Sequence, residues 1–434
     1  MDAHLSRDHP TGLLLAATAS TALILCACAP RPAPCVDLTA LPDALQAGGG
    51  PRPVEIASEG TSLDVIVGGD VVPHRPMLLP VQRLHAGLDP LAALLSTADV
   101  AVVNYESATG DPATFDRAHA ISLGAPAAWL TEVGTRFHAV TVANNHACDL
   151  GTQGLAATLA AARQAGVLAV GGDADRDPWR ARVIDERDGR KVCAVAWTTF
   201  VNTDARACRA SGTIAIAGFD REGKRSIQAA VLRARMDGCD GVVAILHGGQ
   251  EYTGPIWGVR AQARIAADAG ADAVVVHHPH VPAPAVVMVA SDGRKVPVFQ
   301  SVGNLLSNQG ESWATSSFPV SPKHLVAKNA WTRLGVLADL RWSWPAHAAP
   351  ADRPSFTYGY HLTWTDNDHV RHWGNPMPHI STRPLDPQAD RALIERLSSD
   401  ELGPVRLFTD PCWVERSGAR CVMREAGAVA AVGS

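Results

Sequence analysis

The feature that most constrains the fold is a pair of apolar runs that each end in histidine. Residues 242–246 read VVAIL and lead into His247, and residues 273–276 read AVVV and lead into the HHPH sequence of residues 277–280. Residues 257–269 have apolar side chains at helical spacing and precede Gly270, which predicts a crossover helix. Two neighbouring parallel strands would therefore deliver histidines at their carboxyl ends, the edge of an open sheet where ligands bind.

Other apolar runs also lead into polar residues. They are residues 63–67 before Asp70, 100–103 before Asn104 and Glu106, 139–143 before Asn144 and Asn145, and 296–299 before Asn304. A further strand is predicted at 192–196, before a loop at 198–211, and helices are predicted at 89–97 and 152–165. This alternation predicts an α/β protein with a largely parallel sheet, covered by helices, and one site at a single sheet edge.

The residues collected at these strand ends favour a metal site. Imidazole is the commonest protein ligand for transition metals, and carboxylate and amide oxygens complete mixed sets. Asp70, Glu106, Asn145, His247 and two histidines of residues 277–280 offer about six donors, more than one tetrahedral ion needs. Two ions that share one carboxylate fit such a set, and they would activate water and clamp a phosphoryl group. His146, beside Asn145, is then predicted to act as a general acid.

Several of these residues also have a structural interpretation when taken singly. Asp70 follows two glycines and could be a turn residue or a helix cap. Asn144 and Asn145 could form a turn, as could Asn304 after Gly303. Glu106 is a stronger indication, because a carboxylate directly after a buried strand needs a partner. The joint pattern at matching strand ends favours one site.

Other classes of protein lack their signatures in this chain. No Gly-x-Ser-x-Gly elbow follows a strand, and neither the dinucleotide-binding glycine motif nor a P-loop is present. The net charge is only −5 over 434 residues, and no basic stripe with interleaved aromatic residues occurs. Nucleic acid is therefore not an expected partner.

The amino-terminal residues predict export. Residues 12–25 are apolar but short for a membrane span, and they run into Leu25-Cys26-Ala27-Cys28. This pattern resembles a bacterial lipoprotein signal over residues 1–28, with Cys28 as the lipidated residue that anchors the protein to a membrane. A plain cleaved signal peptide is the alternative. Residues 29–60 are rich in Ala, Pro and Gly and are predicted to form a tether.

Export would place the cysteines in an oxidising compartment. Cys412 and Cys421 flank a short turn and predict a hairpin disulfide, and Cys193 and Cys208 bracket a loop and are predicted as a second pair. Residues 308–434 differ from the rest of the chain, with alternating runs at 335–342 and 356–364 and an amphipathic helix at 390–399. This part is predicted to contain antiparallel strands and one helix that extend the sheet or cap the site.

Short motifs in a fixed order resemble one known family. They are Gly69-Asp70, Asn104-x-Glu106, Asn144-Asn145-His146 with Asp149-x-Gly151-x-x-Gly154, His247-x-Gly249-x-Glu251-Tyr252, His278-Pro279-His280-Val281 and Ser301-x-Gly303-Asn304. Together they resemble the bacterial capsule-synthesis CapA family, which is associated with poly-γ-glutamate. The resemblance implies a calcineurin-like metallophosphoesterase fold over residues 61–307, an α/β/β/α sandwich around a two-metal site, followed by a mixed extension over 308–434.

The resemblance also implies roles for individual residues. Metal positions are implied at Asp70, Glu106, Asn145, His247, His278 and His280, with His146 as the catalytic histidine. The residues predicted to contact substrate are Asn104, Glu251, Tyr252, His277 and Asn304. The sequence leaves open whether His277 or His278 faces the metal. Where most metallophosphoesterases have Asp-x-His, this chain has Asp70-Val71-Val72 and so lacks one usual ligand.

The resemblance implies a role in making a surface polymer, and together with the predicted signal and metal site it favours an exported, membrane-anchored hydrolase of the cell envelope. It would use two divalent transition-metal ions, Mn, Fe or Zn, to cleave phosphoesters during synthesis of a surface polymer. Its partners would be the polymer or a phosphorylated precursor, and membrane synthase proteins. The alternative is a non-catalytic accessory lipoprotein that binds an anionic polymer or supports the synthase.

Overall fold

The computed structural model of the chain describes residues 60–74, 81–111, 122–313, 329–349, 352–369, 378–399, 405–408, 410, 412–413 and 421–422. The predicted signal peptide, Cys28, and the predicted tether up to residue 59 lie outside these residues. Within the described residues, no helix combines the length and the apolar character needed to cross a membrane.

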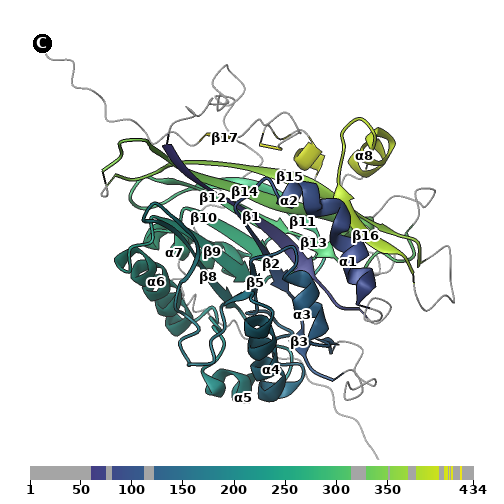
Figure 1. Ribbon diagram of the computed structural model, residues 1–434, viewed down its shortest axis with the longest axis horizontal. Coiled ribbons are helices and arrows are strands. Elements are labelled where there is room, and N and C mark those ends of the chain that lie inside the picture. Colours follow the sequence, from purple (N-terminus) through teal and green to yellow (C-terminus); the bar gives the residue numbers. More distant parts are fainter. Residues whose placement is uncertain are drawn as a thin grey trace, which may run out of the picture. The chain divides into compact units, whose positions relative to one another are not determined.

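Two β-sheets form the centre of the protein (Figure 1). The larger sheet has the order β16-β15-β14-β1-β2-β5-β6, with β13 paired to β1 and β17 paired to β15. Its strands are β1 (Gly60–Val71), β2 (Val100–Tyr105), β5 (Ala139–Thr141), β6 (Leu168–Val170), β13 (Asn304–Leu306), β14 (Leu334–Pro345), β15 (Ser355–Asn367), β16 (Ile380–Pro384) and β17 (Cys421–Val422). Strands β1, β2, β5, β6 and β13 are parallel, whereas β14, β15, β16 and β17 pair antiparallel, so this sheet is mixed.

The second sheet is mostly parallel and has the order β11-β12-β10-β9-β8-β7. Its strands are β7 (Arg182–Arg187), β8 (Arg190–Thr198), β9 (Gly241–His247), β10 (Ala273–His277), β11 (Pro282–Val289) and β12 (Lys295–Val302). Only the two edge strands, β7 and β11, pair antiparallel. A separate short pair joins β3 (Ala108–Thr109) to β4 (Gly124–Ala125).

Helices pack on the outer face of each sheet, and the inner faces share one core. Side chains alternate along each strand, so Val65 and Val67 of β1 join the core between the sheets while Ile66 joins the core beneath the helices. The larger sheet is covered by α1 (Gln82–Leu88), η3 (Asp89–Leu91), α2 (Ala92–Leu95), α3 (Ala128–Val133) and α4 (Gly151–Gln164). The smaller sheet is covered by α6 (Arg221–Met236) and α7 (Trp257–Ala269).

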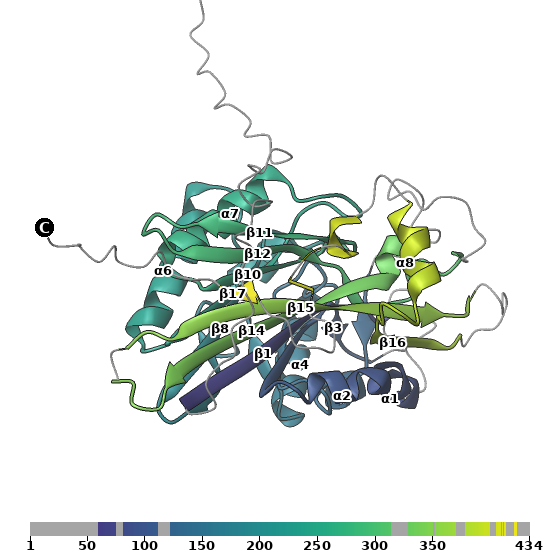
Figure 2. The same ribbon diagram turned by 90° about the horizontal axis from the view of Figure 1, so that it is seen from above.

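The carboxyl-terminal strands extend the larger sheet. Strand β14 pairs with β1 from Gly60↔Pro345 to Val67↔Ala338, and β15 pairs with β14 on the other side. Figure 2 shows β15, β14 and β1 running side by side in this order along the larger sheet. The remaining described elements are α5 (Ala205–Ser211), η6 (Ala330–Arg333), α8 (Arg391–Ser398) and η8 (Val405–Phe408).

The structure confirms the α/β class, the crossover helix α7, the antiparallel pair β14 and β15, and helix α8. Two local predictions are wrong. The segment 198–211 is not all loop, because Asp204 accepts a hydrogen bond from Ala207 N and caps the short helix α5. The single helix predicted at 89–97 is instead the pair η3 and α2, since Pro90 stands in the first turn of η3.

Three disulfides join described cysteines. Cys412–Cys421 confirms the predicted hairpin bridge, and the others are Cys148–Cys208 and Cys193–Cys239. The predicted Cys193–Cys208 pair is wrong, because the two side chains belong to different layers. Cys193 lies under α6 and α7 on the outer face of the smaller sheet, whereas Cys208 packs with the helices of the larger sheet.

Candidate metal centre

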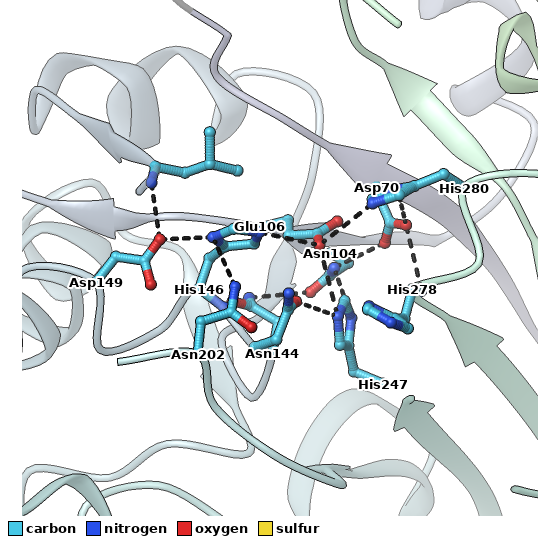
Figure 3. Close-up of polar contacts among 12 residues, drawn as sticks. Asp70, Asn104, Glu106, Asn144, His146, Asp149, Asn202, His247, His278 and His280 are labelled. Atoms are coloured by element: carbon cyan, nitrogen blue, oxygen red, sulfur yellow. Dashed lines mark hydrogen bonds and ion pairs between the residues drawn. The ribbon is translucent and has the colours of Figure 1, made fainter. Parts of the chain in front are cut away.

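The side chains predicted to bind metal meet at one edge of the two sheets (Figure 3). Asp70 is near the end of β1, Glu106 follows β2, Asn145 and His146 follow β5, His247 ends β9, and His278 and His280 follow β10. All of them are buried. Strand ends from both sheets thus form one polar site inside the protein.

Glu106 lies at the centre of this site. Its Oε1 is 3.6 Å from Nε2 of His247, 3.8 Å from Nε2 of His280 and 4.0 Å from Nε2 of His146. Neither carboxylate oxygen has a hydrogen-bond partner among the described residues, although both are buried. Burial and the nearby charge of Asp70 raise the pKa of Glu106 well above its usual value. A buried carboxylate without donors is costly, and a bound cation would satisfy it.

Two buried groups of side chains could each hold a metal ion. One consists of Glu106, His247 and His278, and the other of Asp70, Glu106 and His280; within each group the ligand atoms lie within 4.8 Å of one another. Glu106 belongs to both groups. Imidazole and carboxylate donors together suit Mn, Fe or Zn better than calcium, which prefers oxygen ligands. The residues present therefore fit the predicted metal centre.

The histidines at and after the end of β10 point in different directions. Nε2 of His277 donates a hydrogen bond to the carbonyl of Gly68 at 2.8 Å, so this predicted substrate contact lies against β1 and is fully buried. His278 and His280 have φ angles of 98° and 59°, which are rare for residues other than glycine. Nδ1 of His278 has no hydrogen-bond partner among the described residues. Such strained backbone is typical of functional sites, and here it turns His278 and His280 toward Glu106.

Asn104 lies between the ligands. Its Nδ2 donates to Oδ1 of Asp70 at 2.7 Å and lies 3.2 Å from Nδ1 of His247, and its Oδ1 accepts from Thr141 Oγ1 at 2.8 Å. Because an amide nitrogen only donates, Nδ1 of His247 accepts and Nε2 points to Oδ1 of Asn145 at 2.7 Å. Asn104, predicted to contact substrate, is fully buried and orients Asp70 and His247, two candidate metal ligands.

Asn304 orients His280 in a similar way. Its Oδ1 lies 2.9 Å from Nδ1 of His280, while its Nδ2 donates to Gln309 Oε1 at 2.8 Å and to the carbonyl of Thr332 at 3.0 Å. Strand pairing places Asn304 opposite Asp70. Asn304 therefore gives His280 a fixed hydrogen-bond acceptor. Histidines that bind metal commonly have such a partner.

Burial and neighbouring charges together set the pKa values of the site residues. Burial raises the pKa of Asp70, but the hydrogen bond from His280 and the positive charges of His277 and His280 outweigh it and hold this pKa below its usual range. Burial lowers the pKa of His280, but Glu106 and Asp70 raise it to about 10. Burial and the charge of His278 lower the pKa of His247, so this imidazole is neutral, as metal ligation requires.

His146 is oriented by a carboxylate that carried no predicted role. Nδ1 of His146 lies 2.5 Å from Oδ2 of Asp149, which also accepts from Leu123 N at 2.7 Å. Thr203 Oγ1 donates to the other carboxylate oxygen at 3.2 Å. Asp149 stands three residues after His146 in the same motif, and this spacing is the sequence feature that could have indicated the contact. The contact presents Nε2 of His146 toward Glu106.

The remaining predicted substrate contacts lie near His280. The Tyr252 ring is 6.0 Å from the His280 ring, and its hydroxyl accepts from Gln309 Nε2 at 3.3 Å. Burial and the charge of Glu251 raise the pKa of Tyr252, so the phenol stays protonated. Glu251 itself is exposed. On the other side, Phe200 packs edge-on to His278 with ring centroids 5.2 Å apart, and sequence reasoning did not find this residue.

Known proteins resemble parts of this chain. The "PGA biosynthesis protein CapA" of Bacillus subtilis (strain 168) is 29% identical over 201 residues, which cover 46% of this chain and 50% of that protein. The "Capsule biosynthesis protein CapA" of Bacillus anthracis is 30% identical over 184 residues, covering 40% of this chain and 41% of that protein. The matches therefore span about half the length of these curated relatives or less.

A solved structure and a protein family also match. The structure, a crystal structure of a hypothetical protein from Thermus thermophilus, is 16% identical, covers 74% of this chain and 99% of its own, and has a TM-score of 0.37. Residues 64–309 match the family described as "Bacterial capsule synthesis protein PGA_cap". This match covers more than half of the sequence and contains every residue of the candidate metal centre, and the chain belongs to the bacterial capsule synthesis PGA_cap family.

Proposed function

We propose that this protein is a metal-dependent hydrolase of the phosphoesterase type that acts in the biosynthesis of a surface polymer. The observation that carries the proposal is the position of Glu106, a buried carboxylate without hydrogen-bond donors that belongs to two groups of metal-binding side chains. Family membership and the names of the two Bacillus relatives support a capsule or poly-γ-glutamate pathway.

The side chains of the site have different proposed roles. Asp70, Glu106, His247, His278 and His280 would hold the metal, with Asn145 as a further oxygen donor beside His247. Two bound ions would supply Lewis acidity and a nucleophile from water. Asp149 holds Nδ1 of His146, so a protonated His146 can give its Nε2 proton to the departing oxygen of the substrate. Asn104 and Asn304 keep the ligands in place.

The layer order supports a calcineurin-like metallophosphoesterase fold as part of this proposal. Two sheets share an inner core, and helices pack on both outer faces. The expected Asp-x-His ligand is replaced, because the second residue after Asp70 is the buried Val72. The site would therefore be a variant of the common two-metal centre.

The cellular setting is also proposed. Three disulfides among the described cysteines favour an exported protein, since cytosolic thiols are kept reduced. A lipid anchor at Cys28 would hold it at the membrane of the cell envelope. There it would act on the polymer or a phosphorylated precursor, beside membrane synthase proteins.

The test combines metal content with turnover on the full chain. Elemental analysis should find about two transition-metal ions per protein, and p-nitrophenyl phosphate or its diester should be hydrolysed. His247→Ala should lose both properties. His85→Ala, which changes a half-exposed surface histidine, should keep them. A chain that binds no metal would overturn the proposal. Metal without turnover would instead favour the accessory role, in which the same site binds an anionic polymer.

A further inference from the structure

His74 lies three residues beyond the end of β1, the strand that carries Asp70 of the candidate metal centre. The backbone N–H of Val72 donates to the carbonyl of Leu306 at 2.9 Å, which continues the pairing of β1 with β13 past the last residue of β1. Further along, the backbone N–H of Asn308 donates to Nδ1 of His74 at 3.2 Å. The segments after β1 and β13 therefore leave the sheet side by side, at the edge that carries Asp70 and Asn304.

The hydrogen bond from Asn308 decides which nitrogen of His74 carries the proton. A backbone N–H only donates, so Nδ1 accepts and a neutral ring has its hydrogen on Nε2. No described residue forms a hydrogen bond with Nε2 of His74, and this nitrogen is not among the fully buried polar atoms. His74 thus offers a neutral N–H donor that the fold leaves open.

Charges of the metal centre act on His74. Burial lowers the pKa of His74, and the positive charges of His280 and His146 lower it further, to about 3. These two histidines follow β10 and β5, one strand from each sheet. With its pKa lowered in this way, the His74 ring remains neutral at physiological pH.

The carboxyl-terminal residues brace this arrangement. Oδ1 of Asn308 accepts from Asn367 Nδ2 at 3.0 Å, and its Nδ2 donates to Glu311 Oε2 at 2.9 Å. Glu311 in turn pairs with Nδ1 of His369 at 3.1 Å. Asn367 ends β15 and His369 follows it, so both lie outside the segment that matches the family. The extension therefore fixes the loop that orients His74.

We propose that Nε2 of His74 binds an anionic oxygen of the substrate, namely a non-bridging oxygen of a phosphoryl group held at the metal centre. The proposal rests on the proposed function. His74 is a substrate-binding residue in this scheme and not a metal ligand, since neither group of metal-binding side chains includes it. A neutral donor suits this task, because it adds a hydrogen bond to the phosphoryl group without repelling the metal ions.

The test measures the binding of inorganic phosphate to the metal-loaded full chain. Calorimetry on the wild type, His74→Ala and His74→Gln should show phosphate bound about tenfold more weakly by the alanine variant. The glutamine variant should recover part of the affinity, because its amide keeps an N–H donor. Metal content should be the same in all three, and His85→Ala serves as the matched histidine control. With p-nitrophenyl phosphate, the loss should appear mainly in KM.

The outcomes separate this proposal from the function on which it rests. Wild-type phosphate affinity in His74→Ala, with turnover intact, would overturn the role of His74 and leave the hydrolase standing. If the wild type bound phosphate more tightly than His74→Ala but cleaved no ester, the hydrolase would be overturned and the role of His74 would stand. A wild type without phosphate affinity would overturn the phosphoryl site. Metal loss in His74→Ala would show that His74 supports the ions and not the substrate.

Discussion

Oδ2 of Asp149 lies 2.5 Å from Nδ1 of His146, on the side of the imidazole opposite the nitrogen that faces Glu106. Asp149 is itself held by the backbone of Leu123 and the hydroxyl of Thr203. A carboxylate in this position fixes the tautomer and the orientation of the ring, as it does for catalytic histidines elsewhere. His146 is therefore presented to the metal centre in one orientation.

The first prediction follows from this contact. Asp149→Asn removes the negative charge but keeps the size of the side chain, so kcat should fall by about 10- to 100-fold while metal content stays unchanged. The double variant with His146→Ala should be no worse than His146→Ala alone, because the two residues act as a unit. Steady-state kinetics and elemental analysis check this. Additive losses in the double variant would contradict it.

Glu106→Gln tests the shared ligand. Burial and the charge of Asp70 raise the pKa of Glu106, so a neutral glutamine of similar size should cost the metal-free protein little stability. Metal content should fall by at least half, because both groups of ligands include this carboxylate. Addition of EDTA should lower the Tm of the wild type more than that of the variant. An equal shift in both proteins would rule out Glu106 as a ligand.

The gathering of the predicted ligands at one place could be expected from the sequence, because these residues follow buried strands. Parallel strands share one carboxyl edge, so Asp70, Glu106 and His247 could be assigned to one site from their positions alone. Asn104 and Asn304 occur at the same edge, but whether they face substrate or ligands depends on side-chain direction. Strand alternation likewise does not show which of His277 and His278 faces the metal centre, because the turn after β10 departs from regular strand geometry.

Long-range packing accounts for what sequence reasoning missed. His74 lies outside any apolar run, and its role depends on the hydrogen bond from Asn308, which is distant in the chain. The pairing of β14 with β1 is also remote in sequence, so the antiparallel strands could be predicted but not their place in the sheet. The partner of Cys193 depends on which face of β8 it occupies, and a continuously buried strand gives no alternation that reveals this.

The disulfide Cys148–Cys208 should support catalysis as well as stability. It ties the loop that carries His146 to α5, and Asn202 just before α5 donates through its backbone N–H to the carbonyl of Asn145 at 2.8 Å. Replacing both cysteines by serine should cost about 2–4 kcal/mol of stability and also lower kcat. The matched control replaces Cys193 and Cys239, which lie on the outer face of the smaller sheet, and should lower only stability. Equal kcat values for the two double variants would contradict this prediction.

Gly69 should be intolerant of any side chain. A Cβ atom there would overlap the carbonyl oxygen of Gly303, which stands directly before Asn304 on β13. Gly69→Ala should therefore push β13 away, reduce stability by about 1–3 kcal/mol and weaken metal binding through the loss of the Asn304 contact to His280. Gly254→Ala is the control, since a Cβ atom there meets nothing within 4 Å. Thermal unfolding and metal titration measure both effects, and similar behaviour of the two variants would be the contrary result.

Asp390 gives the fold a pH-dependent contact between β16 and α8. Its two oxygens each lie 2.7 Å from a guanidinium nitrogen of Arg383. Burial raises the pKa of Asp390, but the hydrogen bond from Arg383 outweighs it, so the folded-state pKa is lowered. A lowered pKa means that the stabilisation is fully present above the unfolded value of about 3.9 and is lost as pH falls through the folded value.

Asp390→Asn should therefore reduce the free energy of unfolding by about 1 kcal/mol at pH 7, and the deficit should shrink as the pH falls below 4. Urea unfolding of both proteins across this range provides the measurement. Glu395→Gln is the control, because the Arg391–Glu395 pair is 79% and 64% exposed and surface pairs contribute little. If the deficit of Asp390→Asn stayed constant with pH, the loss would come from packing, and the ion pair would not be its cause.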